Sequence, residues 1–236
     1  MPKRNYTTSI KKHGAWMARK KRRLVRSSKR RPSTSSVKKI CQKIIDKNTE
    51  FKRYVRDLAP TALNNITTGQ ILFQGPQLPQ GSDALDRDGD EVMLRKLRFN
   101  ILTKTTTKPN RVRFILVRYS QPPATLDLST VLLNTTAQNV MLSPWIKNGD
   151  IRYQIVYNKI HRLGTMGVMD SEIKYQQFKI DVKFNKAGDK LHYNGPVTQN
   201  PDKNCYVLYA VCDLAFTPTT GLNEIQMYTE AVFTDM

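Results

Sequence analysis

The stretch Gln177-Phe178-Lys179-Ile180-Asp181-Val182-Lys183-Phe184 decides the fold class, because polar and apolar residues alternate along it without a break. Successive side chains of a strand point to opposite faces of a sheet, so this alternation predicts one buried face and one face in water. Residues 151–157 and 225–233 show the same pattern. Such strands are typical of antiparallel sheets that pack on a core through one face.

The run Tyr206-Val207-Leu208-Tyr209-Ala210-Val211-Cys212 is apolar on both faces, which predicts a central strand that is covered on both sides. Cys205 and Cys212 lie seven residues apart and therefore point to opposite faces of a strand. We expect both to be small buried hydrophobic residues. Since Cys41 is the only other cysteine, no disulfide framework is expected, and we infer a reducing, intracellular setting.

Further β-like runs cover residues 92–103 and 111–119, and shorter ones near 51–58 and 191–193 bring the expected number of strands to about eight. The run 92–103 changes phase near Arg95-Lys96, where we expect a β-bulge. Long turn-rich loops separate the runs, and residues 126–133 can form one or two helical turns. We predict an all-β fold, a single eight-stranded antiparallel jelly-roll sandwich over residues 49–236.

Residues 1–32 form a basic arm with 13 Lys/Arg and no Asp or Glu. Residues 1–47 hold 17 of the 39 basic residues and one of the 19 acidic ones, so residues 48–236 have a net charge of only +4. We expect the arm to be disordered until an anion neutralises it, and nucleic acid is the anion that supplies enough charge. The expected nucleic-acid-binding residues are Lys3, Arg4, Lys11, Lys12, Trp16, Arg19, Lys20, Lys21, Arg22, Arg23, Arg26, Lys29, Arg30 and Arg31.

Two features of the arm have alternative interpretations. Trp16 either stacks on an unpaired base or docks on the folded body. The run from Arg19 to Arg31 resembles a nuclear localisation signal, although any nucleic-acid-binding arm has the same composition.

Residues 33–48 change to a helical pattern, with apolar residues at intervals of three and four between Val37 and Ile45. We predict a short amphipathic helix whose lysines continue the charge of the arm. Its apolar side needs a cover, either the body of the same chain or a neighbouring copy.

The sequence offers no constellation for catalysis. His161 and His192 have no Cys or carboxylate at metal-ligand spacing, and no Ser-centred elbow or Gly-rich phosphate loop is present. The acidic segment 83–91 has its glycine at the wrong place for a calcium loop, so we interpret it as a turn that leads into the next strand. We expect no catalytic residue, no metal and no cofactor. No apolar stretch is long enough to span a membrane, so we also expect no membrane insertion.

A series of short motifs runs through most of the chain. In order they are the basic arm, a strand near 51–57, Gln80-Gly81, Gly89-Asp90, Leu94-Arg95-Lys96-Leu97-Arg98-Phe99, Arg111 to Val117, a strand from Arg152 to His161 and Tyr228 to Asp235. The series resembles the capsid proteins of small circular single-stranded DNA viruses, the circovirus-like (CRESS-DNA) group. The expected shape is also similar to the capsid of satellite tobacco necrosis virus, an RNA packager.

The resemblance implies a single jelly roll, sixty copies of which close into a T=1 icosahedral shell. The arm would then project inward and bind a single-stranded DNA genome without reading its sequence. Implied partners are other copies of the chain, the genome, a host nuclear import receptor and a cell-surface receptor. The implied locations are the virion and, during assembly, the host nucleus.

Within such a shell, six arginines on strands either add positive charge to the inner surface or form ion pairs between subunits. They are Arg95, Arg98, Arg111, Arg113, Arg118 and Arg152. Trp145 and Ile146 either contact a neighbouring subunit or cap the core.

Two other functions stay open. One is a cellular, non-enzymatic nucleic-acid-binding protein of ribosomal or chromatin type with a basic tail. The other is a satellite-virus-like capsid that packages RNA. The many strands with long loops, and the lack of the surface motif of a dedicated binding module, favour a capsid protein over a cellular binding protein, and the choice between DNA and RNA as cargo stays open.

Overall fold

A computed structural model of the chain describes residues 34–48, 50–62, 70–83, 86–105, 110–133, 140–146, 151–163, 174–185, 188–195, 199–212 and 223–236. The chain divides into two compact units, residues 1–49 and 50–236. The predicted helix is present in the first unit as α2 (Thr34–Asn48). Its apolar residues Val37, Ile40 and Ile44 are 43%, 55% and 55% exposed.

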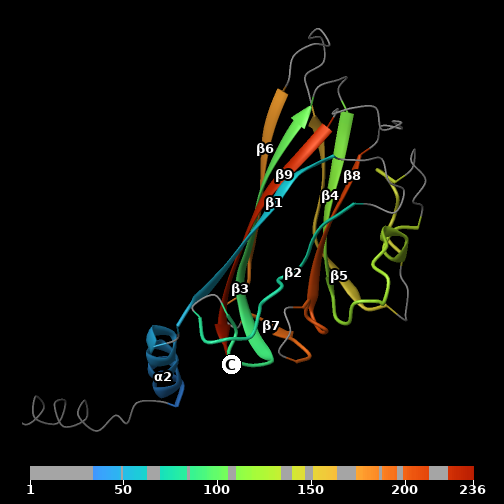
Figure 1. Ribbon diagram of the computed structural model, residues 1–236. Helices are drawn as coiled ribbons and strands as arrows, with labels where there is room; N and C mark the ends of the chain where they lie inside the picture. The colour runs from blue at the N-terminus through green and yellow to red at the C-terminus, as the bar shows by residue number, and fades with distance from the viewer. Residues whose placement is uncertain are drawn as a thin grey trace, which may run out of the picture. The chain divides into compact units, whose positions relative to one another are not determined.

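The second unit is built from two antiparallel sheets that face each other (Figure 1). Sheet A contains β1 (Lys52–Ala62), β9 (Asn223–Asp235), β3 (Glu91–Thr105) and β6 (Lys174–Lys183) in that order, and β7 (Asp189–His192) also pairs with β3. Sheet B contains, in order, β2 (Gln70–Gly75), β8 (Cys205–Cys212), β4 (Asn110–Tyr119) and β5 (Tyr153–Leu163).

The strand order identifies a jelly roll. Strands from the first half of the chain pair with strands from the second half in reverse order, as β1 with β9, β2 with β8, β3 with β6 and β4 with β5. A long ribbon of paired strands that folds over on itself produces this arrangement of two sheets. The predicted all-β jelly-roll sandwich is therefore confirmed.

The described residues contain nine strands, one more than predicted. The additional strand is β2, which the sequence pattern does not predict. Its pairing with β8 shifts register between Ile71 and Phe73. Leu72 and Phe73 are consecutive and both buried, so β2 has no polar and apolar alternation. The short strand expected near 191–193 is β7, which pairs with the first residues of β3 beyond the end of β6.

Two hydrophobic cores lie on opposite sides of sheet B. The main core fills the space between the sheets. A second core lies between the other face of sheet B and the segment around the 3-10 helix η1 (Leu128–Thr130). Every residue of β8 is buried, and its side chains enter the two cores alternately. Cys205 is in the second core and Cys212 in the first, which confirms the predicted opposite orientations.

The predicted bulge in β3 is also present. The pairing of β3 with β9 shifts register between Leu94 and Lys96. The shift keeps Leu94 and Leu97 in the core although they are three residues apart.

Candidate nucleic-acid and assembly surfaces

The predicted nucleic-acid-binding residues from Lys3 to Arg31 lie outside the described residues, as do Trp16 and the stretch that resembles a nuclear localisation signal. The described part of the basic segment is α2, where Lys38, Lys39 and Lys43 are exposed. These lysines add to the positive charge of the arm in the sequence.

The outer face of sheet A is the side that points away from the main core, and its residues form rows across the strands β1, β9, β3 and β6. We call one row the basic row, and it consists of Arg53, Val232, Lys96 and Lys183. The next is the paired row, which consists of Val55, Glu230, Arg98 and Asp181. The third consists of Asp57, Tyr228, Asn100 and Lys179.

Glu230 connects the charges of these rows. Its carboxylate lies 2.9 Å from the Arg53 Nε and accepts a hydrogen bond from an Arg98 terminal nitrogen at 3.2 Å. A second Arg98 nitrogen lies 3.6 Å from an Asp181 oxygen. The Glu230 side chain is only 9% exposed, so its charge requires the two arginines. The charge of Arg98 is therefore matched within the chain.

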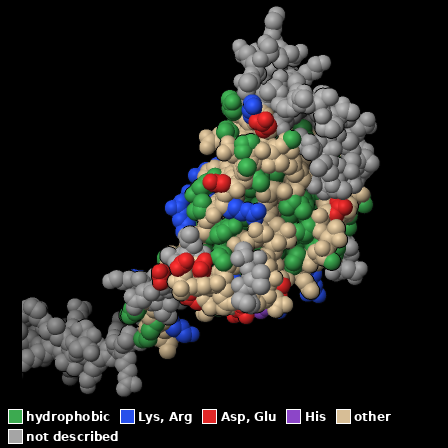
Figure 2. Space-filling view, viewed as in Figure 1, with side chains coloured by type: hydrophobic (Ala, Val, Ile, Leu, Met, Phe, Trp, Pro, Cys, Tyr) green, Lys and Arg blue, Asp and Glu red, His purple; other side chains and the backbone are tan. Residues whose placement is uncertain are grey.

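Figure 2 shows Lys and Arg side chains over the middle of the face on which β1 and β9 lie in front. The basic row contributes three cations and no carboxylate to the outer face of sheet A. Lys183 is exposed and Lys96 is half-buried.

Arg118 connects the two sheets at one end of the sandwich. It reaches from β4 to Asp189 of β7 and forms two parallel hydrogen bonds with the carboxylate, at 2.6 and 2.7 Å. The Tyr206 hydroxyl of β8 donates a third hydrogen bond to Asp189. The carboxylate raises the pKa of Arg118 although burial opposes the shift. Arg118 thus contributes to holding sheets A and B together.

Arg113 is buried, so the expectation that it lies on a surface is wrong. It donates to Asn158 at 2.9 Å and to the Val140 carbonyl at 2.6 Å, and its guanidinium lies 4.9 Å from the centre of the Trp145 ring. Burial lowers its pKa. The arginine holds the segment after η1 against sheet B. Trp145 packs on the second core, as the core-capping interpretation requires.

The remaining three strand arginines have different surroundings. Arg95 is half-buried and lies at the bulge of β3, while Arg111 and Arg152 are exposed on or near sheet B. They are therefore separated over both sheets and do not form one positive surface.

Lys52 joins the start of β1 to the end of β9 and to the acidic segment. Its amine lies 2.8 Å from both Asp88 and Asp235, and it donates to the Asp86 carbonyl at 2.9 Å. Burial acts to lower the pKa of Lys52, but the hydrogen bonds from the amine to the two carboxylates give a net rise. The hydrogen bond from Lys52 lowers the pKa of Asp88.

The described part of the acidic segment, Asp83 and residues 86–91, leads into β3, and the buried Arg87 side chain holds this part in place. The Arg87 side chain is completely buried and lies 4.6 Å from the centre of the Tyr193 ring. It donates to Asp90 at 3.0 Å and to the carbonyls of Gly89 and Gly195. No group of three or more His, Cys, Asp or Glu side chains within the described residues could hold a metal ion.

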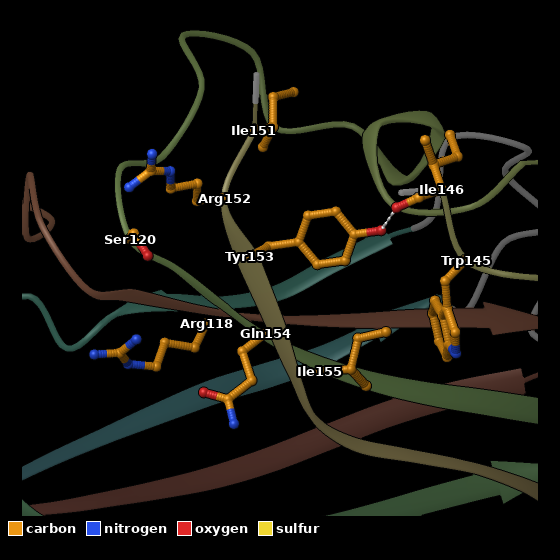
Figure 3. Close-up of a pocket in the computed structure, with 9 residues that line it drawn as sticks. All are labelled: Arg118, Ser120, Trp145, Ile146, Ile151, Arg152, Tyr153, Gln154 and Ile155. Atoms are coloured by element: carbon orange, nitrogen blue, oxygen red, sulfur yellow. Dashed lines mark hydrogen bonds between the residues drawn. The ribbon is translucent and has the colours of Figure 1, made fainter. Parts of the chain in front are cut away.

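A groove with a volume of about 540 Å³ lies beside β5, one of the two edge strands of sheet B. Figure 3 shows Arg118 and Arg152 at the end of the groove away from Trp145, with Tyr153 and Ile155 between the two arginines and Trp145. The Tyr153 hydroxyl donates to the Ile146 carbonyl, which fixes one wall. Among the residues that line the groove, none is a nucleophile paired with a base.

The two described histidines have structural contacts. His161 packs on Phe178 with ring centres 4.4 Å apart, and burial and the nearby Lys159 lower its pKa. His192 is hydrogen-bonded to Asp202 through Nδ1. Within the described residues, no helix is long and apolar enough to cross a membrane.

The jelly roll defines the structural class of the chain. Comparison with known proteins finds remotely similar solved structures. No protein-family model and no curated protein sequence matches the chain. One similar solved structure is a chain of the T13 IBDV particle, with a TM-score of 0.33 and 10% identity over 78% of this chain and 31% of that chain. Another belongs to Desmodium yellow mottle tymovirus, with a TM-score of 0.32 and 12% identity over 79% of this chain and 88% of that one.

The chain thus spans less than a third of the IBDV chain. At these levels of similarity, the assignment of the fold depends on the strand order, which the chain's own pairing establishes.

Proposed function

We propose that the chain is a viral capsid protein that self-assembles into a closed T=1 shell of sixty copies and packages single-stranded DNA. The observation that carries the proposal is a jelly-roll body preceded by 47 residues with 17 Lys/Arg and one acid. The basic segment binds phosphates without sequence preference, and the body associates with copies of itself.

The distribution of charge supports this division of roles. The body has a net charge near +4, so copies of it can approach one another, whereas 17 positive charges per basic segment repel until an anion is present. Sixty basic segments would offset roughly 1,000 phosphates, which is the order expected for a small genome. Assembly therefore depends on nucleic acid, and filled shells form in preference to empty ones.

The shape of the body supports a role in a shell. Four strands, β1, β6, β2 and β5, lie at the ends of the two strand orders, and a neighbouring copy can cover such edges. The exposed apolar residues of α2 provide a further contact surface. In this proposal the chain resides in the virion after assembly in the host nucleus, which it reaches through the stretch from Arg19 to Arg31.

The test is sedimentation of the full chain with absorbance at 260 and 280 nm, compared with a chain lacking residues 1–32. We expect a large uniform species with nuclease-protected cargo for the full chain, and loss of the cargo on truncation. The extracted cargo should be degraded by DNase, whereas degradation by RNase would indicate an RNA-packaging capsid. If both chains stay monomeric or dimeric with and without nucleic acid, the chain is a cellular nucleic-acid-binding protein with a basic tail.

A further inference from the structure

We propose that the outer face of sheet A carries a second nucleic-acid-binding surface, formed by Lys96, Lys183 and Lys179 with Tyr175. We call this set the β6 patch, since three of its members lie on β6. It is separate from the arm because it belongs to the folded body. That its ligand is the packaged genome rests on the proposed function, but the binding of a single-stranded polyanion does not require a shell.

The first argument is a repulsion within the sheet. Lys96 and Lys183 occupy directly opposite positions of the β3–β6 pair and point to the same face. Like charges at such positions destabilise a sheet. Within the described part of the chain, neither lysine forms an ion pair or a side-chain hydrogen bond, and the same is true of Lys179. A bound phosphate would remove this repulsion.

The second argument is that the neighbouring carboxylates are already matched. Glu230 binds both Arg53 and Arg98. Asp181 lies between Lys179 and Lys183 on β6, yet its partner is Arg98 at 3.6 Å. Glu224 is paired with Lys104 at 3.1 Å. The lysines of the β6 patch therefore add positive charge beside a network that is close to neutral.

Tyr175 adds the group that distinguishes a nucleic acid from a simple anion. It lies on the same face of β6, four residues before Lys179, and is 64% exposed. An exposed aromatic ring in line with lysines can stack on an unpaired base while the lysines contact phosphates. From Tyr175 to Lys183 the strand extends roughly 27 Å, which accommodates several nucleotides.

The construction of the sandwich explains why this face is available. The outer face of sheet B is buried under the second core, whereas the outer face of sheet A carries mostly polar and charged residues. The basic segment leads directly into β1, and Arg53 on that strand belongs to the basic row. A strand of nucleic acid held by the arm is thus tethered to the sheet that carries the β6 patch.

The test is residue-specific footprinting of the full chain with an amine-reactive reagent, read by mass spectrometry. The reactivity of each lysine is compared between the free chain, the chain bound to a single-stranded oligonucleotide, and any particles before and after removal of their cargo. Lys203 is the internal control because it is exposed and lies outside the outer face of sheet A. We expect at least about fivefold protection of the three patch lysines by nucleic acid, and none of Lys203.

Each result bears on the inference. Protection that persists after the cargo is removed would mean that a neighbouring copy covers the face, and equal reactivity in every state would mean that nothing binds there; either result overturns the proposal. A chain that never forms shells but shows nucleic-acid-dependent protection would refute the capsid proposal and leave the β6 patch standing. Shells that form while the patch lysines stay unprotected would support the capsid proposal and refute the β6 patch.

The salt dependence of oligonucleotide binding provides a second measurement. The plot of log K against log salt has a negative slope, and each lost phosphate contact with a single strand reduces the magnitude of that slope by about 0.7. The slope of the triple variant K96Q/K179Q/K183Q should therefore be about 2 smaller in magnitude. The matched control is R152Q/R162Q/K203Q, which removes three exposed charges elsewhere. Equal losses in both variants would show a general charge effect and contradict a defined surface. Tyr175→Ala should weaken binding by at least about fivefold through lost stacking.

Discussion

The outer faces of the two sheets differ in whether the chain itself covers them. In sheet B, the outward side chains of β4 and β8 are buried under the segment that contains η1. In sheet A, most outward side chains are polar or charged, and four of them form ion pairs across the four strands β1, β9, β3 and β6. The difference shows that the chain itself covers the outward side chains of β4 and β8, whereas within the described residues many side chains on the outer face of sheet A remain at the surface.

The largest expected effect is a difference in stability between a variant on the outer face of sheet B and one on the outer face of sheet A. Tyr209 is fully buried in the second core and its hydroxyl lies 3.0 Å from that of Tyr119. Tyr209→Ala should lower the free energy of unfolding by about 3–5 kcal/mol, because it removes a large buried ring. Leu102 on the outer face of sheet A is 37% exposed, and Leu102→Ala should change the same free energy by no more than about 0.5 kcal/mol. Denaturant unfolding of the dissociated chain measures both, and equal costs would contradict the contrast.

The next effect concerns the connection between the sheets. Arg118→Met leaves Asp189 partly buried without its cation and should cost about 2–3 kcal/mol, somewhat less than removal of a partner from a fully buried pair. The double variant R118M/D189N is the control, since it also removes the unpaired charge and should recover part of the loss. If the double variant loses more free energy of unfolding than the two single variants lose together, the ion pair is not what connects the sheets.

A change in the paired row should separate stability from binding. Glu230→Gln removes the charge shared by Arg53 and Arg98 and should lower the free energy of unfolding by about 1–2 kcal/mol. The same change makes the outer face of sheet A more positive, so oligonucleotide binding should become tighter. Fluorescence anisotropy at several salt concentrations measures the binding, with Asp83→Asn as a matched control at an exposed position outside the strands of sheet A. Weaker binding would argue against this face as a nucleic-acid surface.

The smallest effect is a pH dependence of stability. The folded state lowers the pKa of His161 from its usual value of 6.5 through burial. The unfolded chain therefore binds a proton more readily, and the free energy of unfolding should fall as the pH drops below 6.5. Unfolding curves at pH 7 and pH 5 measure this loss. His161→Phe should reduce the pH dependence, and an unchanged dependence would assign it to other groups.

The sequence predicts the parts of the fold that depend on side-chain alternation. The alternation at Phe178–Phe184 and the fully apolar run of β8 each indicate a face, and a sandwich follows from several such strands. The break in phase at Arg95-Lys96 indicates the bulge, because a core strand must return Leu97 to the interior. These features are local and need no knowledge of the partner strand.

Features that depend on distant partners were not predictable. Arg87 lies among aspartates and suggests a solvent-exposed turn, yet it is buried because Gly195 and Tyr193 come from another part of the chain. The ion pairs of Arg98 and Arg118 likewise require the register of β9 and the position of β7. The β6 patch is visible only once β3 and β6 are paired, since Lys96 and Lys183 are 87 residues apart in the sequence.

The most direct test of the central claim is the mass of the particle formed by the full chain with nucleic acid, measured by mass photometry or native mass spectrometry. A subunit of 27.2 kDa predicts a protein shell of about 1.6 MDa for sixty copies, with additional mass from nuclease-protected nucleic acid. A single narrow species at that mass would support the capsid function. Monomers or dimers with stoichiometric nucleic acid, at every salt concentration, would contradict it.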